Sequence, residues 1–222
     1  MYLDLKKYCN HYGYDFVELR DPSYDDVSIG IAWWRIRAVQ ELFVIGYDVV
    51  MHVDADTVPI TLSVSIQDHM NKSSSNQTIM WVSQDLTNMG NAPYFRCINF
   101  GVFIIKKNAT NIKMLEDVWQ QRFERTMWPR EQGAIQDWLI KTVKTQEQWD
   151  TYYHVSPLGD WQNFGIVGNG ADDGGGEFTK NSDYMINVMF PASTSWIFHA
   201  VSMGVRTVDD QSAIIRTIYE HL

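Results

Sequence analysis

Two acidic residues, Asp54 and Asp56, follow an apolar stretch and are separated by Ala55. Residues 47–53 read as a buried strand. Side chains two positions apart on an extended chain point the same way, so both carboxylates can reach one cation. Hard oxygen ligands of this kind suit Mg²⁺ or Mn²⁺, which keep positions open for the phosphates of a substrate. The alternative is an acidic turn in which Asp56 or Thr57 caps the next segment.

A second apolar strand is predicted over residues 195–200, and it carries His199. A neutral imidazole at this point could supply a third ligand to a cation held by Asp54 and Asp56. The alternative is a histidine that is satisfied within the core. The tight segment that follows ends at Gly204, and its backbone N–H groups could approach a phosphate.

The elements that must position these side chains alternate between helical and strand-like patterns, which favours an α/β fold with a largely parallel sheet. In open sheets of this kind, ligands bind at the carboxyl ends of the strands, where the acidic pair and the histidine fall. One expected helix opens the chain and stops at Gly13, and the others span roughly residues 33–43, 62–70, 110–124, 132–144 and 208–219. The expected strands span roughly residues 14–19, 47–53, 79–83, 97–105 and 195–200. No linker divides the chain, so residues 1–222 are expected to form one domain.

Composition excludes several classes of protein. The 27 acidic and 18 basic residues give a net charge of −9, which argues against nucleic-acid binding. An apolar fraction of 45% with 20% charged residues excludes wholesale disorder. No run of apolar residues is long enough to span a bilayer. Nine tryptophans are a surplus that suits either a core or stacking on sugars.

Six ordered segments resemble those of GT-A nucleotide-sugar glycosyltransferases, and are most similar to glycosyltransferase family 34, the galactosyl-, mannosyl- and xylosyltransferases. In chain order they are Tyr-Cys-Asn-His-Tyr-Gly-Tyr at 8–14, Trp-Arg-Ile at 34–36, His-Val-Asp-Ala-Asp at 52–56, Asn-Phe-Gly-Val-Phe-Ile-Ile-Lys-Lys-Asn at 99–108, Glu-Gln-Gly-Ala at 131–134 and Phe-His-Ala at 198–200. The chain departs from the family pattern at Tyr12, which replaces a histidine, at Arg35, which replaces a lysine, and at Glu131, which replaces an aspartate.

The resemblance implies a GT-A fold, Rossmann-like, and a metal-dependent sugar transfer that retains anomeric configuration. The partners would be a UDP- or GDP-sugar donor and a saccharide acceptor, with Mn²⁺ or Mg²⁺ as cofactor. Two rival functions stay open. One is a catalytically inactive relative that binds glycans or a partner enzyme. The other is a metal-dependent nucleotidyltransferase or phosphohydrolase, since paired aspartates serve those enzymes too.

The resemblance also assigns site residues. The metal ligands would be Asp54, Asp56 and His199. Gln132 and its neighbour Glu131 would be catalytic, with Gln132 facing the donor sugar; the alternative for both is a helix N-terminal turn, where acidic residues are favoured. The donor pocket would be lined by Asn99 and Gly101, together with Ala55 and Gly204.

Two further expectations concern completeness and compartment. GT-A folds begin with a strand before the helix that here ends at Gly13, so the domain is expected to be N-terminally incomplete, with the family's membrane anchor and stem upstream. Three Asn-x-Ser/Thr sequons, at Asn71, Asn76 and Asn108, suit a glycoprotein of the Golgi or secretory lumen. Turn chemistry and helix capping are the alternative, and they leave a cytoplasmic location open.

The tryptophans can then be divided. Trp119 and Trp138 lie in predicted helices and are expected in the core. The tryptophans expected to be available for sugar stacking are Trp81, Trp128, Trp149 and Trp161.

Overall fold

The structure is a computed structural model that describes residues 2–18, 31–54, 57–59, 63–84, 98–125, 130–156, 162–168 and 197–203. The chain divides into two compact units. Unit 1 comprises Met1–Asp15, Val53–Ser65 and Ser156–Leu222, and unit 2 comprises Phe16–His52 and Ile66–Val155.

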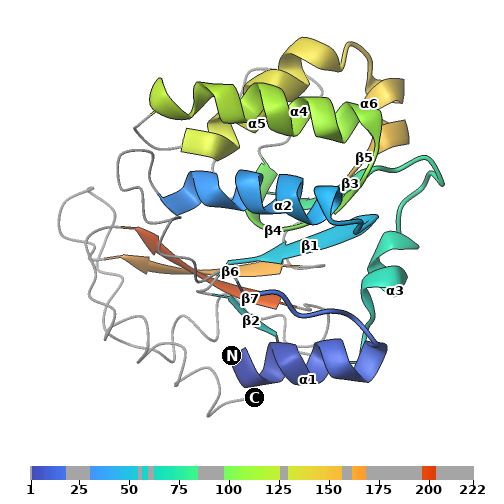
Figure 1. The fold of residues 1–222 in the computed structure, drawn as a ribbon, viewed down its shortest axis with the longest axis vertical. Coiled ribbons are helices and arrows are strands. Elements are labelled where there is room, and N and C mark those ends of the chain that lie inside the picture. Colours follow the sequence, from blue (N-terminus) through green and yellow to red (C-terminus); the bar gives the residue numbers. More distant parts are fainter. Residues whose placement is uncertain are drawn as a thin grey trace. The chain divides into compact units, whose positions relative to one another are not determined.

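A four-stranded sheet forms the centre of unit 2, in the order β1-β4-β3-β5 (Figure 1). Its strands are β1 (Val49–Val53), β3 (Met80–Gln84), β4 (Ile98–Lys106) and β5 (Tyr153–Ser156). All residues of β4 except the last are buried. That explains its nearly continuous apolar run, which is typical of a strand covered on both faces.

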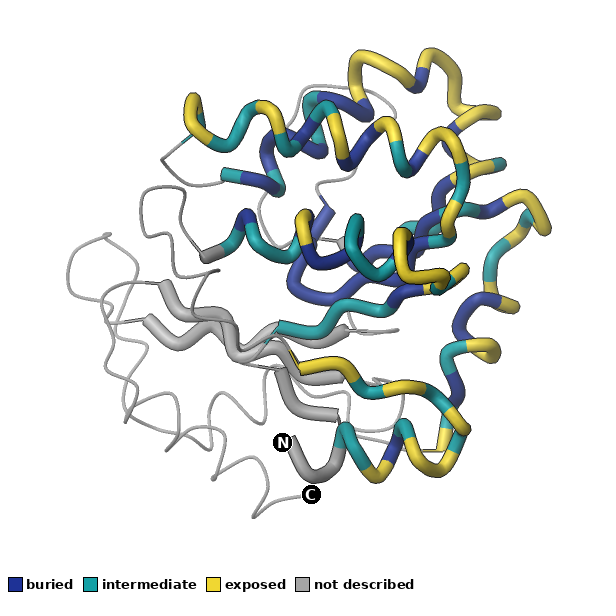
Figure 2. Tube along the Cα trace, viewed as in Figure 1, coloured by how far each residue is buried: buried dark blue, intermediate teal, exposed yellow. Residues whose placement is uncertain are grey.

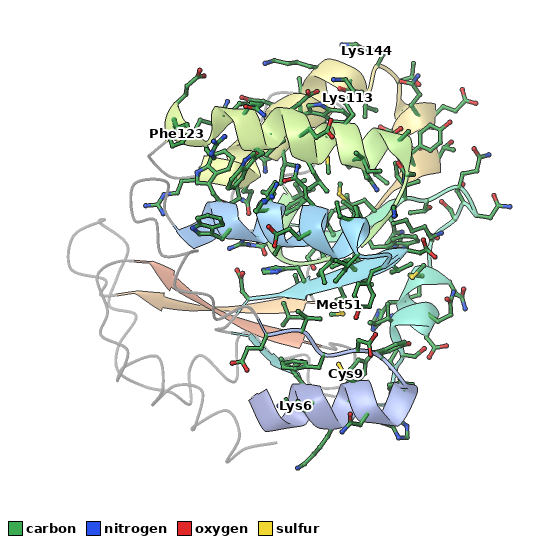
Figure 3. The ribbon with its side chains drawn as sticks, in the orientation of Figure 1. Lys6, Cys9, Met51, Lys113, Phe123 and Lys144 are labelled. Carbon is green, nitrogen blue, oxygen red and sulfur yellow. The ribbon has the colours of Figure 1, made fainter. Side chains whose placement is uncertain are left out.

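Three helices of unit 2 lie side by side over the sheet: α2 (Trp34–Val44), α4 (Ala109–Gln120) and α5 (Arg130–Thr142) (Figure 1). Two short 3₁₀ segments, Ile31–Trp33 and Gln121–Phe123, precede α2 and follow α4. The shorter helices are α3 (Ile66–Met70) and α6 (Gln146–Tyr152). Lys113, Phe123 and Lys144 lie on the outer surface of this unit (Figure 3).

Local sequence signals fix the ends of two of these helices. The Asn108 side chain accepts a hydrogen bond from the backbone N–H of Asn111 (2.9 Å) and so caps the start of α4. After α2 the chain turns at Gly46, where φ is 114°, a conformation that favours glycine. The Lys107 ammonium donates to the carbonyl of Phe43 (2.6 Å) and satisfies an open acceptor in the last turn of α2.

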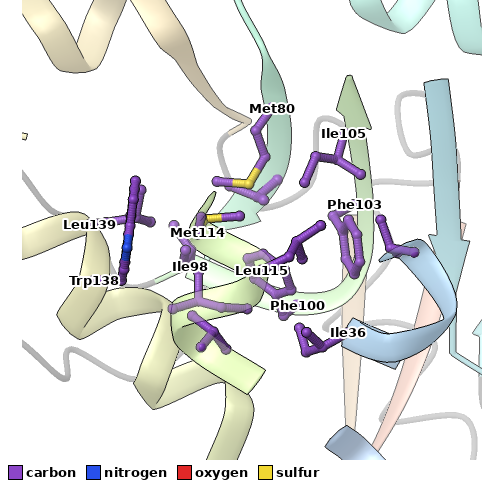
Figure 4. Close-up of a cluster of buried hydrophobic side chains, with 14 of the residues drawn as sticks. Ile36, Met80, Ile98, Phe100, Phe103, Ile105, Met114, Leu115, Trp138 and Leu139 are labelled. Carbon is purple, nitrogen blue, oxygen red and sulfur yellow. The ribbon is translucent and has the colours of Figure 1, made fainter. Parts of the chain in front are cut away.

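The hydrophobic core of unit 2 lies between the sheet and these helices, and buried positions follow β3, β4 and the inward faces of α2, α4 and α5 (Figure 2). Figure 4 shows its centre, which contains Ile36, Met80, Ile98, Phe100, Phe103, Ile105, Met114, Leu115, Trp138 and Leu139. Trp138 belongs to this core as expected, and Trp119 packs against it.

The stacking role expected for two tryptophans is wrong. Trp81 is 1% exposed and Trp149 is 6% exposed, so neither offers a ring face to a sugar. Trp81 lies on β3, and Trp149 packs against Tyr153 with ring centroids 5.0 Å apart. The remaining two, Trp128 and Trp161, lie outside the described residues.

Unit 1 contains a helix and a three-stranded sheet in the order β2-β7-β6. Its elements are α1 (Tyr2–Tyr12), β2 (Thr57–Pro59), β6 (Gln162–Gly168) and β7 (Ile197–Met203). The hydroxyl of Tyr8 donates to the carbonyl of Val64 (3.0 Å), and the Tyr8 ring packs against those of Tyr12 and Tyr14. The first ordered motif therefore forms an aromatic cluster at the end of α1.

The pairing directions are more mixed than the sequence suggested. Strands β6 and β7 are parallel, whereas β3–β4 and β2–β7 are antiparallel. The α/β class is confirmed, because both units contain helices together with a β-sheet. Apolar patterning reports burial, and a buried strand reads alike in either pairing direction.

The strand predicted at the start of the chain is wrong: residues 14–18 form no strand. Exposure alternates over residues 14–17, with Val17 45% exposed, and Glu18 breaks the pattern because it is exposed too. Alternation alone does not supply the neighbouring strand that a ladder requires. The helix expected over residues 208–219 lies outside the described residues. In the part of the chain that is described, no helix combines the length and apolar character needed to cross a bilayer.

Candidate functional site

Four of the predicted site residues come together in unit 2. Asn99 and Gly101 lie at the start of β4, and Glu131 and Gln132 lie in the first turn of α5. The structure adds Arg35 from the start of α2 and the backbone of Phe100. We refer to these six residues, Arg35, Asn99, Phe100, Gly101, Glu131 and Gln132, as the Phe100 cluster.

An irregularity in the sheet shapes this cluster. Along β3, Val82 pairs with Phe103 and the next residue, Ser83, pairs with Asn99, so residues 100–102 of β4 bulge out of that ladder. The Asn99 side chain accepts a hydrogen bond from the backbone N–H of Gly101 (2.8 Å) within the bulge. Bulges redirect backbone and side chains and are frequent beside active sites.

The bulge presents the backbone of Phe100 to side chains from two helices. The Phe100 N–H donates to Oε1 of Gln132 (3.0 Å). Because a backbone N–H can only donate, the amide oxygen must face it, and this fixes the orientation of the Gln132 amide. The NH₂ group of Gln132 is then the end that can donate to a second molecule or side chain.

The carbonyl of Phe100 accepts a hydrogen bond from Nη1 of Arg35 (2.6 Å). Nε of Arg35 lies 3.5 Å from Oε1 of Glu131, and the two side chains are 14% and 7% exposed. Glu131 therefore forms a largely buried ion pair. The residue before it, Arg130, has a φ of 34°, a backbone conformation that residues other than glycine rarely adopt. Strained backbone of this kind clusters at functional sites.

Arg35 was not among the predicted site residues, although its Trp-Arg-Ile motif was singled out. The signal that could have found it is a permanent charge between two bulky apolar neighbours, Trp34 and Ile36. A charge at such a position needs a buried partner. That partner, Glu131, is 96 positions away in the sequence (131 − 35). Spacing alone therefore does not identify it.

The predicted metal ligands belong to unit 1. Asp54 follows β1 and is half-buried. His199 pairs with Thr57 across the antiparallel β2–β7 ladder and with Phe164 across the parallel β7–β6 ladder. The backbone of β7 thus places His199 opposite the residue that follows Asp56.

Three predicted residues of this region, Ala55, Asp56 and Gly204, lie outside the described residues. Among the side chains that the structure describes, which do not include those of Asp56 and His199, no three His, Cys, Asp or Glu residues converge. Two carboxylates and an imidazole are a donor set that Mn²⁺ and Mg²⁺ accept. The metal assignment stays a prediction.

The three sequons differ in their structural setting. Asn71 and Asn76 are exposed in the segment between α3 and β3, whereas Asn108 is engaged as the cap of α4. The hydroxyl of Thr78, in the second sequon, is also engaged, and donates to the carbonyl of Ser75 (2.9 Å).

The comparison with known proteins supports the fold. No protein-family model matches the chain, and no curated protein matches it. Among solved structures, the chain is similar to a glycosyltransferase involved in the glycosylation of the major capsid of PBCV-1, with a TM-score of 0.60 and 15% sequence identity. The match covers 96% of this chain and 88% of that one. The chain therefore has an α/β fold that resembles that of a glycosyltransferase.

Proposed function

We propose that the chain is a metal-dependent, retaining glycosyltransferase that moves a hexose or pentose from a nucleotide-diphosphate donor to a saccharide acceptor. The observation that carries the proposal is the likeness to a glycosyltransferase fold over 96% of the chain. The Phe100 cluster supports it independently, because a bulged strand and the start of a helix hold polar side chains in a fixed arrangement. The ordered motifs of family 34 supply the finer assignment.

Three residues of the Phe100 cluster, Asn99, Gly101 and Gln132, would bind and orient the donor sugar. With Oε1 of Gln132 held by the Phe100 N–H, the NH₂ group would donate to sugar hydroxyls. Asn99 and Gly101 would line the donor pocket, where the absence of a side chain at Gly101 permits close approach. Asp54, Asp56 and His199 would hold the cation, which when bound offsets the charge that develops on the departing nucleoside diphosphate.

The test is an assay of the purified full chain with Mn²⁺ and a panel of UDP- and GDP-sugars. We expect release of nucleoside diphosphate, with transfer to a saccharide acceptor and retained anomeric configuration in the product by NMR. Asp54→Asn should abolish the metal-dependent activity, and His199→Ala should weaken its Mn²⁺ dependence. Asp48→Asn is the matched control, because Asp48 is an exposed aspartate just before the other end of β1.

Three outcomes would contradict the proposal. Absence of nucleotide binding even with metal would favour a glycan- or partner-binding relative. Hydrolysis of simple phosphate esters would favour a phosphohydrolase or nucleotidyltransferase. A product of inverted configuration would refute the retaining mechanism.

A further inference from the structure

We infer that Arg35 is a positioning residue that holds Gln132 in place through the backbone of Phe100. The inference deepens the proposed function and rests on it for the reaction, but its structural part can be tested without activity. The role differs from that of a residue that touches the substrate. Arg35 would act on the reaction only by fixing where the Gln132 amide points.

The contacts link three elements, α2, β4 and α5, and lead from Arg35 back to Arg35. Arg35 on α2 donates to the Phe100 carbonyl on β4 (2.6 Å), and the Phe100 N–H donates to Gln132 on α5 (3.0 Å). Gln132 follows Glu131 directly in the chain, and Glu131 returns to Arg35 through the 3.5 Å ion pair. Both backbone polar groups of one bulged residue are therefore held by side chains from two different helices.

The geometry calls for arginine. A guanidinium is a rigid planar fork, so Nη1 can reach the Phe100 carbonyl while Nε faces Glu131. A lysine ammonium is a single point of charge on a flexible stem and cannot reproduce both directions at once. The chain has arginine here where the resembling family has lysine. Arg35→Lys therefore keeps the charge and removes the two-pronged contact.

Loss of Arg35 should leave α2 in place. The helix is anchored in the core by Ile36, Val39 and Phe43, which are at most 3% exposed. Its last turn is tied to the strand end by the hydrogen bond from Lys107 to the Phe43 carbonyl. A variant at Arg35 is thus expected to perturb the bulge and the start of α5, while the helix stays packed.

The experiment compares the wild type with Arg35→Lys and Arg35→Met, and uses Arg37→Met as control. Arg37 lies on the same helix, and its partner Glu41 is on that helix too, so it does not touch the cluster. The readouts are kcat and KM for the best nucleotide sugar, and hydrogen exchange of the Phe100 amide in ¹⁵N-phenylalanine-labelled protein. A misplaced group about 1 Å from its working position costs about 100-fold in rate.

We expect both Arg35 variants to lower kcat by about 10- to 100-fold while the KM for the donor changes little. Exchange of the Phe100 amide should accelerate by at least about tenfold, because its acceptor Gln132 is no longer held. Arg37→Met should change neither quantity. The far-UV circular dichroism of both Arg35 variants should match that of the wild type, which shows that the sheet is intact.

Two results would overturn the inference. Unchanged Phe100 exchange in both Arg35 variants would show that Arg35 does not hold this point. An increase in the KM for the donor with an unchanged kcat would show that Arg35 binds the donor directly. If the wild type turns over no nucleotide sugar, the proposed function fails, and the exchange rates still decide whether Arg35 positions Gln132.

Discussion

The stability of unit 2 should depend far more on one arginine of α2 than on another two positions away. Arg35 and Glu131 form a pair whose side chains are 14% and 7% exposed, whereas Arg37 and Glu41 form a pair that is 46% and 42% exposed. The exposed pair is the shorter, at 2.9 Å against 3.5 Å. Burial, not distance, should decide which pair contributes more to the free energy of unfolding, because water screens the charges of the exposed pair.

The magnitude follows from what each substitution leaves behind. Arg35→Met removes the Arg35 counter-charge from the buried Glu131 carboxylate and a hydrogen-bond donor from the Phe100 carbonyl, which costs about 3–5 kcal/mol. For a chain of this length each kcal/mol lowers Tm by about 2–4 °C, so the lower estimate corresponds to about 6–12 °C. Arg37→Met should cost about 0.2–1 kcal/mol.

The assay is urea and thermal unfolding of Arg35→Met, Glu131→Gln, the double variant and Arg37→Met, followed by tryptophan fluorescence. The double variant should be more stable than the sum of the single effects predicts, because Glu131→Gln removes the buried charge. High salt should reduce the effect of Arg37→Met and change that of Arg35→Met little. Equal losses from Arg35→Met and Arg37→Met, or strict additivity in the double variant, would refute the reasoning.

Two further predictions concern pH and helix capping. Burial, with a smaller effect of Tyr152, raises the pKa of Tyr153 to about 12, so the folded chain keeps a proton that the unfolded chain loses above about pH 10. Stability should fall between about pH 10 and 12, by up to roughly 2–3 kcal/mol, and urea midpoints of Tyr153→Phe should lack that fall. Asn108→Ala should cost about 1 kcal/mol by removing the cap of α4, whereas Asn108→Asp, which keeps the acceptor, should cost little in the same measurement.

The sequence predicted those elements whose pattern reflects burial alone. The apolar run of β4 and the helical spacing of α2 identified both elements to within a residue or two. The same kind of pattern failed at residues 14–18, because alternation does not reveal whether a neighbouring strand exists. Trp81 and Trp149 were misassigned for a related reason: an aromatic residue has the same composition signal in a core as at a sugar site.

The sequence predicted several residues of the candidate site, but not the contacts that join them. The sequence predicted Glu131 and Gln132 as neighbouring catalytic residues; in the structure Gln132 contacts Phe100 of β4, whereas Glu131 pairs with Arg35 of α2, and their catalytic role stays a prediction. The bulge at residues 100–102 was not predicted, although a glycine inside a strand pattern, here Gly101, is a signal for one. The link between Arg35 and Glu131 joins two helices, α2 and α5, that are far apart in the sequence.

The bulge in β4 has an evolutionary consequence. Because side chains from α2 and α5 hold both polar groups of Phe100, this point can be altered by substituting those side chains, without re-pairing the strands beside it. Selection can therefore retune the bulge while the rest of β4 continues to specify the fold. Such a separation is consistent with a similar fold found at 15% sequence identity over 96% of the chain.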